Sequence, residues 1–319
     1  MGCNEKLLPL KFYGLMLVGK TMVSATETLR RFEIPGRVTI IEGNGELPKV
    51  EVSSDAGCAE VYLHGAHVTD FQLAGQPPLL FVSQCSRFAR NQAIRGGIPI
   101  ILPWFGSREG EPAHGFARLV DWELHETSAL PEGGATLRFR LPETNASAMW
   151  PPFTANYVVT VTDKLMLELI VTNCSRDQRF SFENCLHTYF HIGDISQVSI
   201  HGLKGATYID KVDSYAQKTE KGEAITVSSE VDRAYLDTPC VVEIHDRLLR
   251  RRIRIDKSGS QSTVVWNPWI AKSQQMPDFG DEEYKQMVCV ESGNVGRNKI
   301  VIPRGHSSLL RVVISSSAL

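Results

Sequence analysis

Residues 156–172 read NYVVTVTDKLMLELIVT, and this stretch indicates the fold class more clearly than any other in the chain. Two runs rich in β-branched and apolar residues, Tyr157–Thr162 and Leu165–Val171, flank the polar pair Asp163-Lys164. Short apolar runs on either side of a polar turn are typical of a β-hairpin. The stretch therefore predicts two antiparallel strands.

Similar short runs recur from Arg37 onward, separated by Gly, Pro, Asn and Asp. We expect further strands at residues 61–63, 68–73, 136–141, 198–200, 241–244, 253–255, 263–266, 288–290 and 309–314. Helical periodicity is scarce, and Asp281–Gln286 is the clearest candidate for a turn or two of helix. Regularly spaced short strands favour an all-β protein with a large antiparallel sandwich over βαβ units.

The chain of 319 residues is long enough to bury a large core, and no break in composition marks a boundary within it. We expect one domain over residues 33–319 and an N-terminal appendage, poorly ordered, over residues 1–32. Leu7–Val18 is apolar but too short to span a membrane, and it is interrupted by Lys11.

Lys and Arg number 34 against 36 for Asp and Glu, which leaves a net charge of −2. Such a balance gives no global field for nucleic acid or a membrane surface, so we expect neither as a partner. The seven cysteines contain no pair with CxxC spacing. A reduced, cytoplasmic setting is the simplest interpretation.

The stretch from Ile94 to Arg118 departs from ordinary sheet sequence. Arg95 precedes a glycine pair, and Arg118 closes the motif His114-Gly115-Phe116-Ala117-Arg118. Glycines allow the backbone to approach a ligand closely, and two guanidinium groups suit bidentate recognition of phosphate. The alternative is a stiff loop whose arginines pair with surface carboxylates.

Two other segments contain candidate acid–base groups. His187 and His191 lie four residues apart in an aromatic run, where strand alternation would place them on one face. Glu291 follows the apolar run Val288–Val290, and a buried carboxylate has a raised pKa that suits a general base. Each residue could instead be a hydrogen-bonded structural group, and no third metal ligand can be named.

Aromatic and acidic side chains add candidate sugar contacts. Trp266-Asn267-Pro268-Trp269 supplies two indoles, whose faces and polar edges suit a sugar ring, although buried tryptophans more often belong to a core. Asp232 could accept a hydrogen bond from a sugar hydroxyl, or it could be an ordinary turn or ion-pair residue.

Together, in this order, the motifs resemble those of the glucose-6-phosphate 1-epimerases, the hexose-6-phosphate mutarotases. The resemblance extends from about Arg37 to the C-terminus. The motifs that carry it are Arg95-Gly-Gly-Ile-Pro99, Pro103-Trp-Phe-Gly106, His114-Gly-Phe-Ala-Arg118, Leu186-His-Thr-Tyr-Phe190, Asp232-Arg233, Trp266-Asn-Pro-Trp269 and Val290-Glu291.

The resemblance implies a galactose-mutarotase-like β-supersandwich whose active site needs no cofactor and no metal. It implies that His187 is the general acid and Glu291 the general base in the interconversion of sugar anomers. The implied substrate contacts are Arg95, His114, Arg118, Asp232 and Trp269. The implied partner is a sugar phosphate.

One position departs from the family pattern. A polar residue, often Gln, precedes the His-Gly-Phe-Ala-Arg motif in the family, whereas this chain has Ala113. The resemblance therefore implies that a side-chain contact at this position would be lost, whereas a contact from its backbone could survive.

Two alternatives stay open at this point: an aldose 1-epimerase for unphosphorylated sugars, and a catalytically silent carbohydrate-binding module on the same fold. Glycosidase activity is disfavoured because that chemistry usually needs two carboxylates. The sequence does not choose among hexose 6-phosphates, and it does not determine the oligomeric state, for which a monomer is our starting expectation.

Overall fold

The computed structural model describes residues 25–319, and it is built almost entirely from antiparallel strands. Every pairing between its named strands is antiparallel. The prediction of an all-β antiparallel fold is confirmed. Part of the predicted appendage, residues 1–24, lies outside the described residues.

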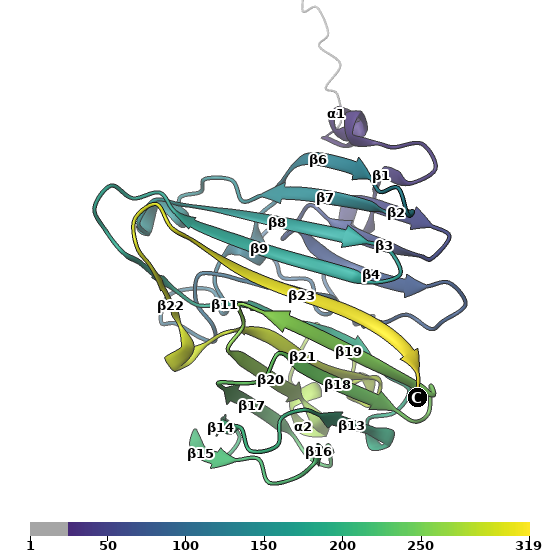
Figure 1. The fold of residues 1–319 in the computed structure, drawn as a ribbon, viewed down its shortest axis with the longest axis vertical. Helices are drawn as coiled ribbons and strands as arrows, with labels where there is room; N and C mark the ends of the chain where they lie inside the picture. The colour runs from purple at the N-terminus through teal and green to yellow at the C-terminus, as the bar shows by residue number, and fades with distance from the viewer. Residues whose placement is uncertain (1–24) are drawn as a thin grey trace, which may run out of the picture.

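The largest sheet has nine strands, and Figure 1 shows it crossing the molecule from β6 at the top to β13 and β16 at the bottom. Its long strand β23 runs through the middle. In sheet order the strands are β16 (Ala224–Ile225), β13 (Val198–His201), β18 (Val241–Asp246), β19 (Arg251–Ser258), β23 (Ser307–Ala318), β9 (Leu165–Asn173), β8 (Phe153–Val161), β7 (Ala135–Arg140) and β6 (Glu123–Ala129).

The second sheet, of eight strands, carries most of the residues discussed below. In order it contains β15 (Ala216–Thr219), β14 (Thr207–Asp210), β17 (Val231–Leu236), β20 (Ser262–Asn267), β21 (Met287–Asn294), β11 (Asn184–Leu186) and β5 (Ile100–Ile101), with β12 (Tyr189–His191) also paired to β21. Strand β21 is buried along its whole length, as expected for a strand in the middle of a sheet that is covered on both faces.

Two smaller sheets and several short helices complete the described chain. The four-stranded sheet has the order β1 (Val38–Glu42), β2 (Pro48–Ser54), β3 (Gly57–Tyr62) and β4 (His67–Leu73), and β10 (Phe180–Phe182) pairs with β22 (Ile300–Ile302). The helices are α1 (Ala25–Leu29), η1 (Arg30–Phe32), η2 (Asn44–Glu46), η3 (Ala117–Leu119), η4 (Ser147–Met149), η5 (Ile195–Gln197), α2 (Trp269–Ser273), η6 (Glu283–Gln286) and η7 (Gly296–Asn298).

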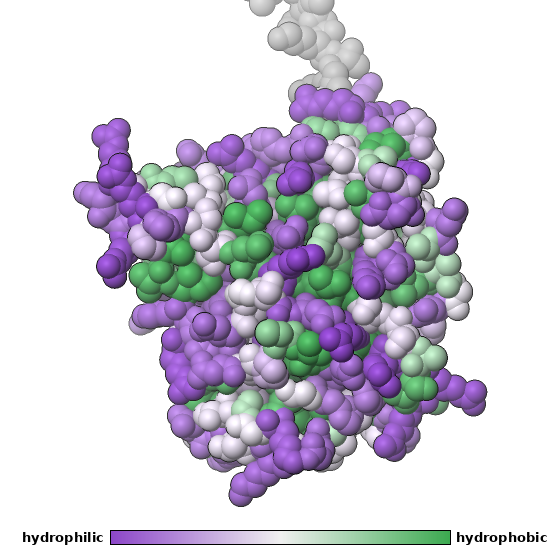
Figure 2. Space-filling view, in the orientation of Figure 1, coloured by the Kyte–Doolittle hydropathy of each residue, from purple (hydrophilic) through white to green (hydrophobic). Residues whose placement is uncertain are grey.

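The hairpin predicted from residues 156–172 is present as β8 and β9, which pair in register from Phe153 with Asn173 to Val161 with Leu165. Strand β9 alternates between buried and partly exposed residues, so its apolar side chains enter the core on one face only. Figure 2 shows the corresponding outer surface as a mixture of hydrophilic and hydrophobic residues. All the other predicted strands are also found, and the predicted helical segment near residue 281 forms the single turn η6.

One contiguous apolar core joins the sheets, with members from Val38 in β1 to Ile314 in β23. Leu29 and Phe32 pack against this core, and the Thr127 hydroxyl donates a hydrogen bond to the Phe32 carbonyl. The packed part of the chain therefore begins before residue 33.

Arg251 is a buried, charged residue whose guanidinium joins β19 to three backbone carbonyls of other segments. Its guanidinium donates to the carbonyls of Pro77, Pro78 and His191, and it lies 4.0 Å from the buried Asp246 carboxylate. We expect Arg251→Ala to lower the free energy of unfolding by about 3–5 kcal/mol, because it removes the cation beside the buried Asp246 carboxylate and the donor to three carbonyls. Urea unfolding of the wild type and the variant measures this difference in free energy.

The exposed Arg138, which pairs with Glu126 on the surface, provides the control for that measurement. Arg138→Ala should change the free energy of unfolding by less than about 1 kcal/mol. Equal losses from the two variants would contradict the role given to Arg251.

Candidate active site

His187 and Glu291 face each other at the floor of a cavity. His187 lies at the break between β11 and β12, and Glu291 lies in β21. The Nε2 atom of His187 is 3.3 Å from Oε1 of Glu291, and the two residues are 7% and 1% exposed. The structure therefore brings together the two residues predicted to form the acid–base pair. His191 does not line this cavity, although strand alternation would have placed it with His187.

The environment of Glu291 favours its protonated form. Burial raises its pKa to about 8, and the charge of Asp232 contributes in the same direction. The positive charges of Lys211 and Arg118 oppose this effect, as does the Cys185 thiol, which lies 3.5 Å from Oε2.

The environment of His187 favours its neutral form. Burial lowers its pKa well below the usual range, and the nearby His114, Arg118 and Arg95 lower it further. Both shifts favour an arrangement in which the carboxyl group carries the proton and the imidazole is neutral. A group that can give a proton and a group that can accept one thus lie within contact distance.

The cavity above this pair has a volume of about 580 Å³. Its lining combines cations, carboxylates and aromatic rings, which is the composition expected for a polar ring-shaped ligand. The lining residues are Arg95, Phe105, Gly106, Ser107, His114, His187, Tyr189, Lys211, Tyr215, Asp232, Val264, Trp266, Lys272, Met276 and Glu291.

Arg95 is held in the cavity wall by protein partners. Its Nε and Nη2 donate to Oδ2 of Asp278 at 3.1 and 3.0 Å, and its Nη1 donates to the Tyr189 hydroxyl at 3.1 Å. The adjoining glycines allow neighbouring backbone segments to pack closely. A Cβ on Gly96 would lie 2.4 Å from the Phe81 carbonyl oxygen, and one on Gly97 would lie 2.3 Å from that of Val68.

The second arginine motif folds so that its histidine enters the site. His114 adopts a left-handed backbone conformation with φ of 66°, and its ring meets that of His187 edge-on at 5.6 Å. Arg118 is not among the lining residues, but its Nη2 donates to the Ala113 carbonyl at 2.8 Å while its buried Nε has no partner. At the departure from the family pattern, the Ala113 backbone therefore holds Arg118.

Asp232 and the tryptophans lie on neighbouring strands. Asp232 in β17 is opposite Trp266 in β20, and both line the cavity. Trp269, the predicted contact, does not line it and instead packs on Tyr284 at 5.2 Å. The signal that distinguishes the two indoles is strand alternation, because Trp266 shares a face with Val264, another lining residue.

Sequence reasoning missed Lys211, Tyr189 and Asp278. Lys211 follows β14 and pairs with Asp232 at 2.9 Å, and its Nζ lies 4.7 Å from the centre of the Phe105 ring. Tyr189 and Asp278 hold Arg95. Tyr189 stood within a motif that was singled out for its histidine, whereas no local pattern marked the other two.

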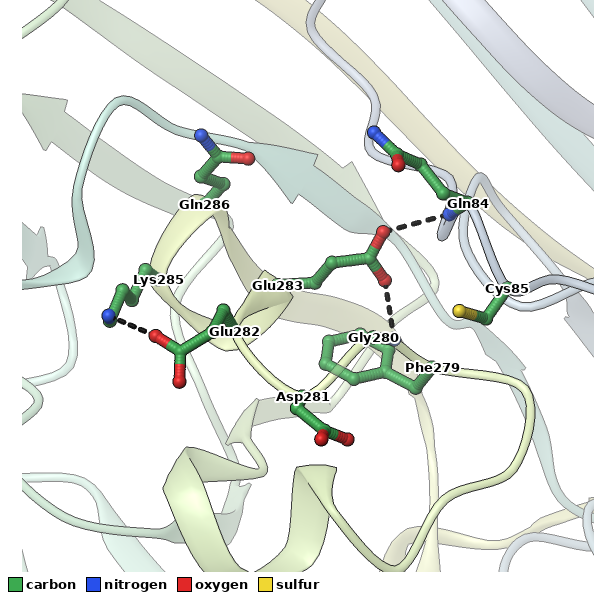
Figure 3. A pocket seen from close by; sticks show the side chains of 9 residues that line it. All are labelled: Gln84, Cys85, Phe279, Gly280, Asp281, Glu282, Glu283, Lys285 and Gln286. Atoms are coloured by element: carbon green, nitrogen blue, oxygen red, sulfur yellow. Dashed lines mark hydrogen bonds and ion pairs between the residues drawn. The ribbon is translucent and has the colours of Figure 1, made fainter.

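A second cavity, of about 640 Å³, is lined by residues 279–283, 285 and 286, which follow Asp278, and by Gln84 and Cys85 (Figure 3). The Glu283 carboxylate there accepts hydrogen bonds from the backbone N–H groups of Gln84 and Gly280, both at 2.8 Å. Glu283 therefore joins the loop after Asp278 to the loop that leads to Arg95. None of the predicted site residues lines this cavity.

Within residues 25–319, one group has the donor types and spacing to hold a metal ion. It consists of His187, Cys289 and Glu291, whose donor atoms lie within 4.8 Å of one another. Two of the three are the predicted acid–base pair, so a metal ion here would compete with proton transfer. A metal-free site stays a prediction.

The resemblance inferred from the motifs is confirmed: this is a sugar epimerase of the mutarotase class. The chain belongs to the aldose 1-epimerase family, whose sequence model matches residues 48–315. A protein from Cenchrus ciliaris, described as a candidate glucose-6-phosphate 1-epimerase, is 37% identical over 268 residues that cover 81% of each chain. An Escherichia coli protein described in the same words is 36% identical over 255 residues, covering 77% of this chain and 83% of its own.

A solved structure from Salmonella typhimurium, described as a candidate mutarotase, has a TM-score of 0.83 and 30% identity. The match covers 90% of this chain and 96% of that one. The galactose 1-epimerase of Lactobacillus acidophilus, at 12% identity and a TM-score of 0.64, shares the fold, with coverage of 88% and 99%. The predicted mutarotase-like sandwich is thus confirmed. In the described part of the chain, no helix has the length and apolarity needed to cross a membrane.

Proposed function

We propose that this enzyme interconverts the α and β anomers of a hexose 6-phosphate, with glucose 6-phosphate as its expected substrate. The observation that carries the proposal is the buried His187–Glu291 pair beneath a cavity that also contains Arg95, Lys211 and Lys272. The names of the relatives from Cenchrus ciliaris and Escherichia coli support the same substrate.

The reaction needs two proton transfers and no net gain or loss of protons. One group removes the proton of the C1 hydroxyl while another donates a proton to the ring oxygen, and the C1–O5 bond breaks. The open aldehyde rotates about C1–C2, and the same steps in reverse close the ring as the other anomer. General acid–base catalysis contributes roughly 10²–10⁴-fold, which suffices because spontaneous mutarotation is already measurable.

We assign removal of the C1 proton to Glu291 and donation to the ring oxygen to His187. This assignment requires a proton to move from the Glu291 carboxyl group to His187 over the 3.3 Å contact between them. Arg118 and Arg95 lower the pKa of His187, so an anion bound in the cavity beside Arg95 would raise that pKa and favour the imidazolium. A phosphate dianion would thus prepare the pair for catalysis.

The ion pairs that the cations of the cavity already form support a second candidate, an epimerase for unphosphorylated aldoses. Arg95 is paired with Asp278, Lys211 with Asp232 and Lys272 with Glu230, so each already has a carboxylate partner. A phosphate would have to compete with these partners. The third alternative, a silent sugar-binding module, would have no use for the acid–base pair.

The deciding experiment is anomer exchange followed by NMR on glucose 6-phosphate and, separately, on glucose. We expect the wild-type protein to accelerate exchange of the phosphate ester by several powers of ten, and that of glucose far less. Faster exchange of glucose would favour the unphosphorylated substrate class. Binding of either sugar without any acceleration would leave only the binding module.

The pH dependence of kcat/KM should be bell-shaped, because the pair works only while it holds one proton. Above the Glu291 pKa of about 8 the pair loses that proton, so we expect activity to fall on the alkaline side. Well below pH 6.5 His187 is protonated as well, so the pair holds two protons and activity falls again. A rate that rises through pH 8 would instead mean that Glu291 must be fully deprotonated in the free enzyme.

We propose a cytoplasmic setting for this activity. The six cysteines in the described part of the chain (Cys58, Cys85, Cys174, Cys185, Cys240 and Cys289) are all free thiols, which agrees with a reducing compartment.

A further inference from the structure

Among the described residues, two side chains form a hydrogen bond or an ion pair with the Glu291 carboxylate, one at each oxygen. Oε1 faces Nε2 of His187 at 3.3 Å, and Oε2 faces Sγ of Cys185 at 3.5 Å. Buried carboxylates usually accept hydrogen bonds from backbone N–H groups, hydroxyl groups or cations. Within residues 25–319, a thiol takes the place of these stronger donors at Glu291.

The fold builds a specific place for this thiol. Cys185 is fully buried in β11, between Gly293 of β21 and Ile101 of β5. A Cβ on Gly293 would lie 2.3 Å from the Asn184 carbonyl oxygen and 2.7 Å from the Cβ of Cys185, so glycine at this position lets β21 lie close against β11. The other neighbours include the apolar Ala234 and Val264. The carboxylate is thus the polar group that this thiol contacts in the described structure.

We propose that Cys185 is a positioning residue for Glu291: its thiol donates a hydrogen bond to Oε2 and thereby keeps Oε1 directed at His187. The proposal rests on the proposed function, because it concerns the group assigned there to proton transfer. A thiol is a weak donor. It can orient the carboxylate while binding it less tightly than a hydroxyl or backbone N–H would.

A hydrogen-bond donor at position 185 changes the pKa of Glu291, whereas a side chain that only fills space does not. A donor to Oε2 favours the charged carboxylate, so removing it should raise the Glu291 pKa. In Cys185→Ala the alkaline limb of the kcat/KM profile should therefore move up, by about one pH unit for the loss of one such hydrogen bond. In Cys185→Ser a hydroxyl restores a donor, and the limb should return to the wild-type position or below it.

The other titratable groups that face Glu291 stay unchanged in these variants, so a shift reports on position 185. They are His187 before β12, Tyr189 in β12, Lys211 after β14, Asp232 in β17, Arg118 in η3, Cys289 in β21 and, near the thiol itself, Lys257 in β19. The second phosphate pKa of the substrate, near 6, affects the acid limb only.

Cys289→Ala is the matched control. Cys289 is also fully buried on the same face of β21, and its Sγ lies within 4.8 Å of the carboxylate, but it makes no hydrogen bond to that group in the described structure. The variant deletes the same sulfur atom at a similar depth. It should leave the alkaline limb within about 0.2 pH units of wild type, a tolerance well below the shift expected at position 185.

The experiment is kcat/KM for glucose 6-phosphate from pH 6 to 10 in the wild type and the three variants, corrected for spontaneous exchange. We expect an upward shift of the alkaline limb in Cys185→Ala, with a fall of about tenfold in the pH-independent rate, and rescue of both in Cys185→Ser. An unchanged limb in Cys185→Ala, or equal shifts in the alanine and serine variants, would overturn the proposal. The limb position does not depend on the fraction of folded protein, so partial misfolding cannot imitate the result.

Failure of the proposed function would look different. It would appear as a wild-type protein without activity, or as a Glu291→Gln variant with full activity, before any Cys185 variant is compared. The wild type could instead be active and the Glu291→Gln variant inactive, while the alkaline limb of the kcat/KM profile is unchanged in the Cys185 variants. That result would reject only the role of the thiol.

Discussion

Replacing Glu291 with glutamine should lower kcat/KM for anomer exchange by about 10²–10⁴-fold, the largest effect we expect from a single substitution. The amide has nearly the size of the carboxyl group and can still meet Nε2 of His187, but it cannot give or take a proton at neutral pH. Because the amide has nearly the shape of the carboxyl group that it replaces in the buried strand β21, the change should leave the fold intact. Exchange of the anomeric proton signals by NMR measures the loss.

Asp70 supplies the control for that substitution. Burial also raises the pKa of this carboxyl group, to about 6, but it lies in β4 and does not line the active-site cavity. Asp70→Asn should change kcat/KM by less than about twofold. An active Glu291→Gln variant would exclude the carboxyl group from the chemistry and leave His187 to act with another partner.

The second large effect should follow from Arg95→Ala, which we expect to lower kcat/KM for glucose 6-phosphate by about 10²-fold while sparing glucose. A charge-assisted hydrogen bond contributes about 1.5–3 kcal/mol, and the variant also leaves the Asp278 carboxylate free to repel a phosphate. Arg118→Ala should act in the same direction, since its charge also reaches the pair. Parallel NMR assays with the two sugars measure both.

Arg90 provides the surface control, because it is largely exposed and pairs with Asp121 away from the cavity. Arg90→Ala should affect neither sugar. Equal losses for glucose and glucose 6-phosphate in Arg95→Ala would show that the arginine supports the cavity wall rather than recognising the phosphate.

Much of the fold could be predicted from local sequence patterns. The β8–β9 hairpin follows from alternating apolar residues around a polar turn, and the strands at β7, β18 and β19 follow from the same signal. The pattern works because a strand that buries one face repeats every two residues. Which strands pair across long distances, as β9 pairs with β23, has no local signal.

The candidate site was predictable where its residues stand in motifs. His187, Glu291, Arg95, His114 and Asp232 were all identified from sequence, and they line one cavity. Trp269 shared a motif with Trp266, but the chain turns at Pro268 and directs the later indole onto Tyr284. Asp278 stands in no motif, and its importance appears only when its carboxylate is seen to hold Arg95.

The sequence by itself determined that this chain is an antiparallel β protein of the mutarotase class, because periodicity and motif order are local properties of a chain. The tertiary structure decided the chemistry of the site. His187 and Glu291 acquire opposite pKa shifts only through burial and through charges from distant segments, because Arg118 lowers the pKa of His187 further and Asp232 raises that of Glu291. Desolvation and Coulomb energies depend on distances in space, and these distances exist only after the sheets have packed.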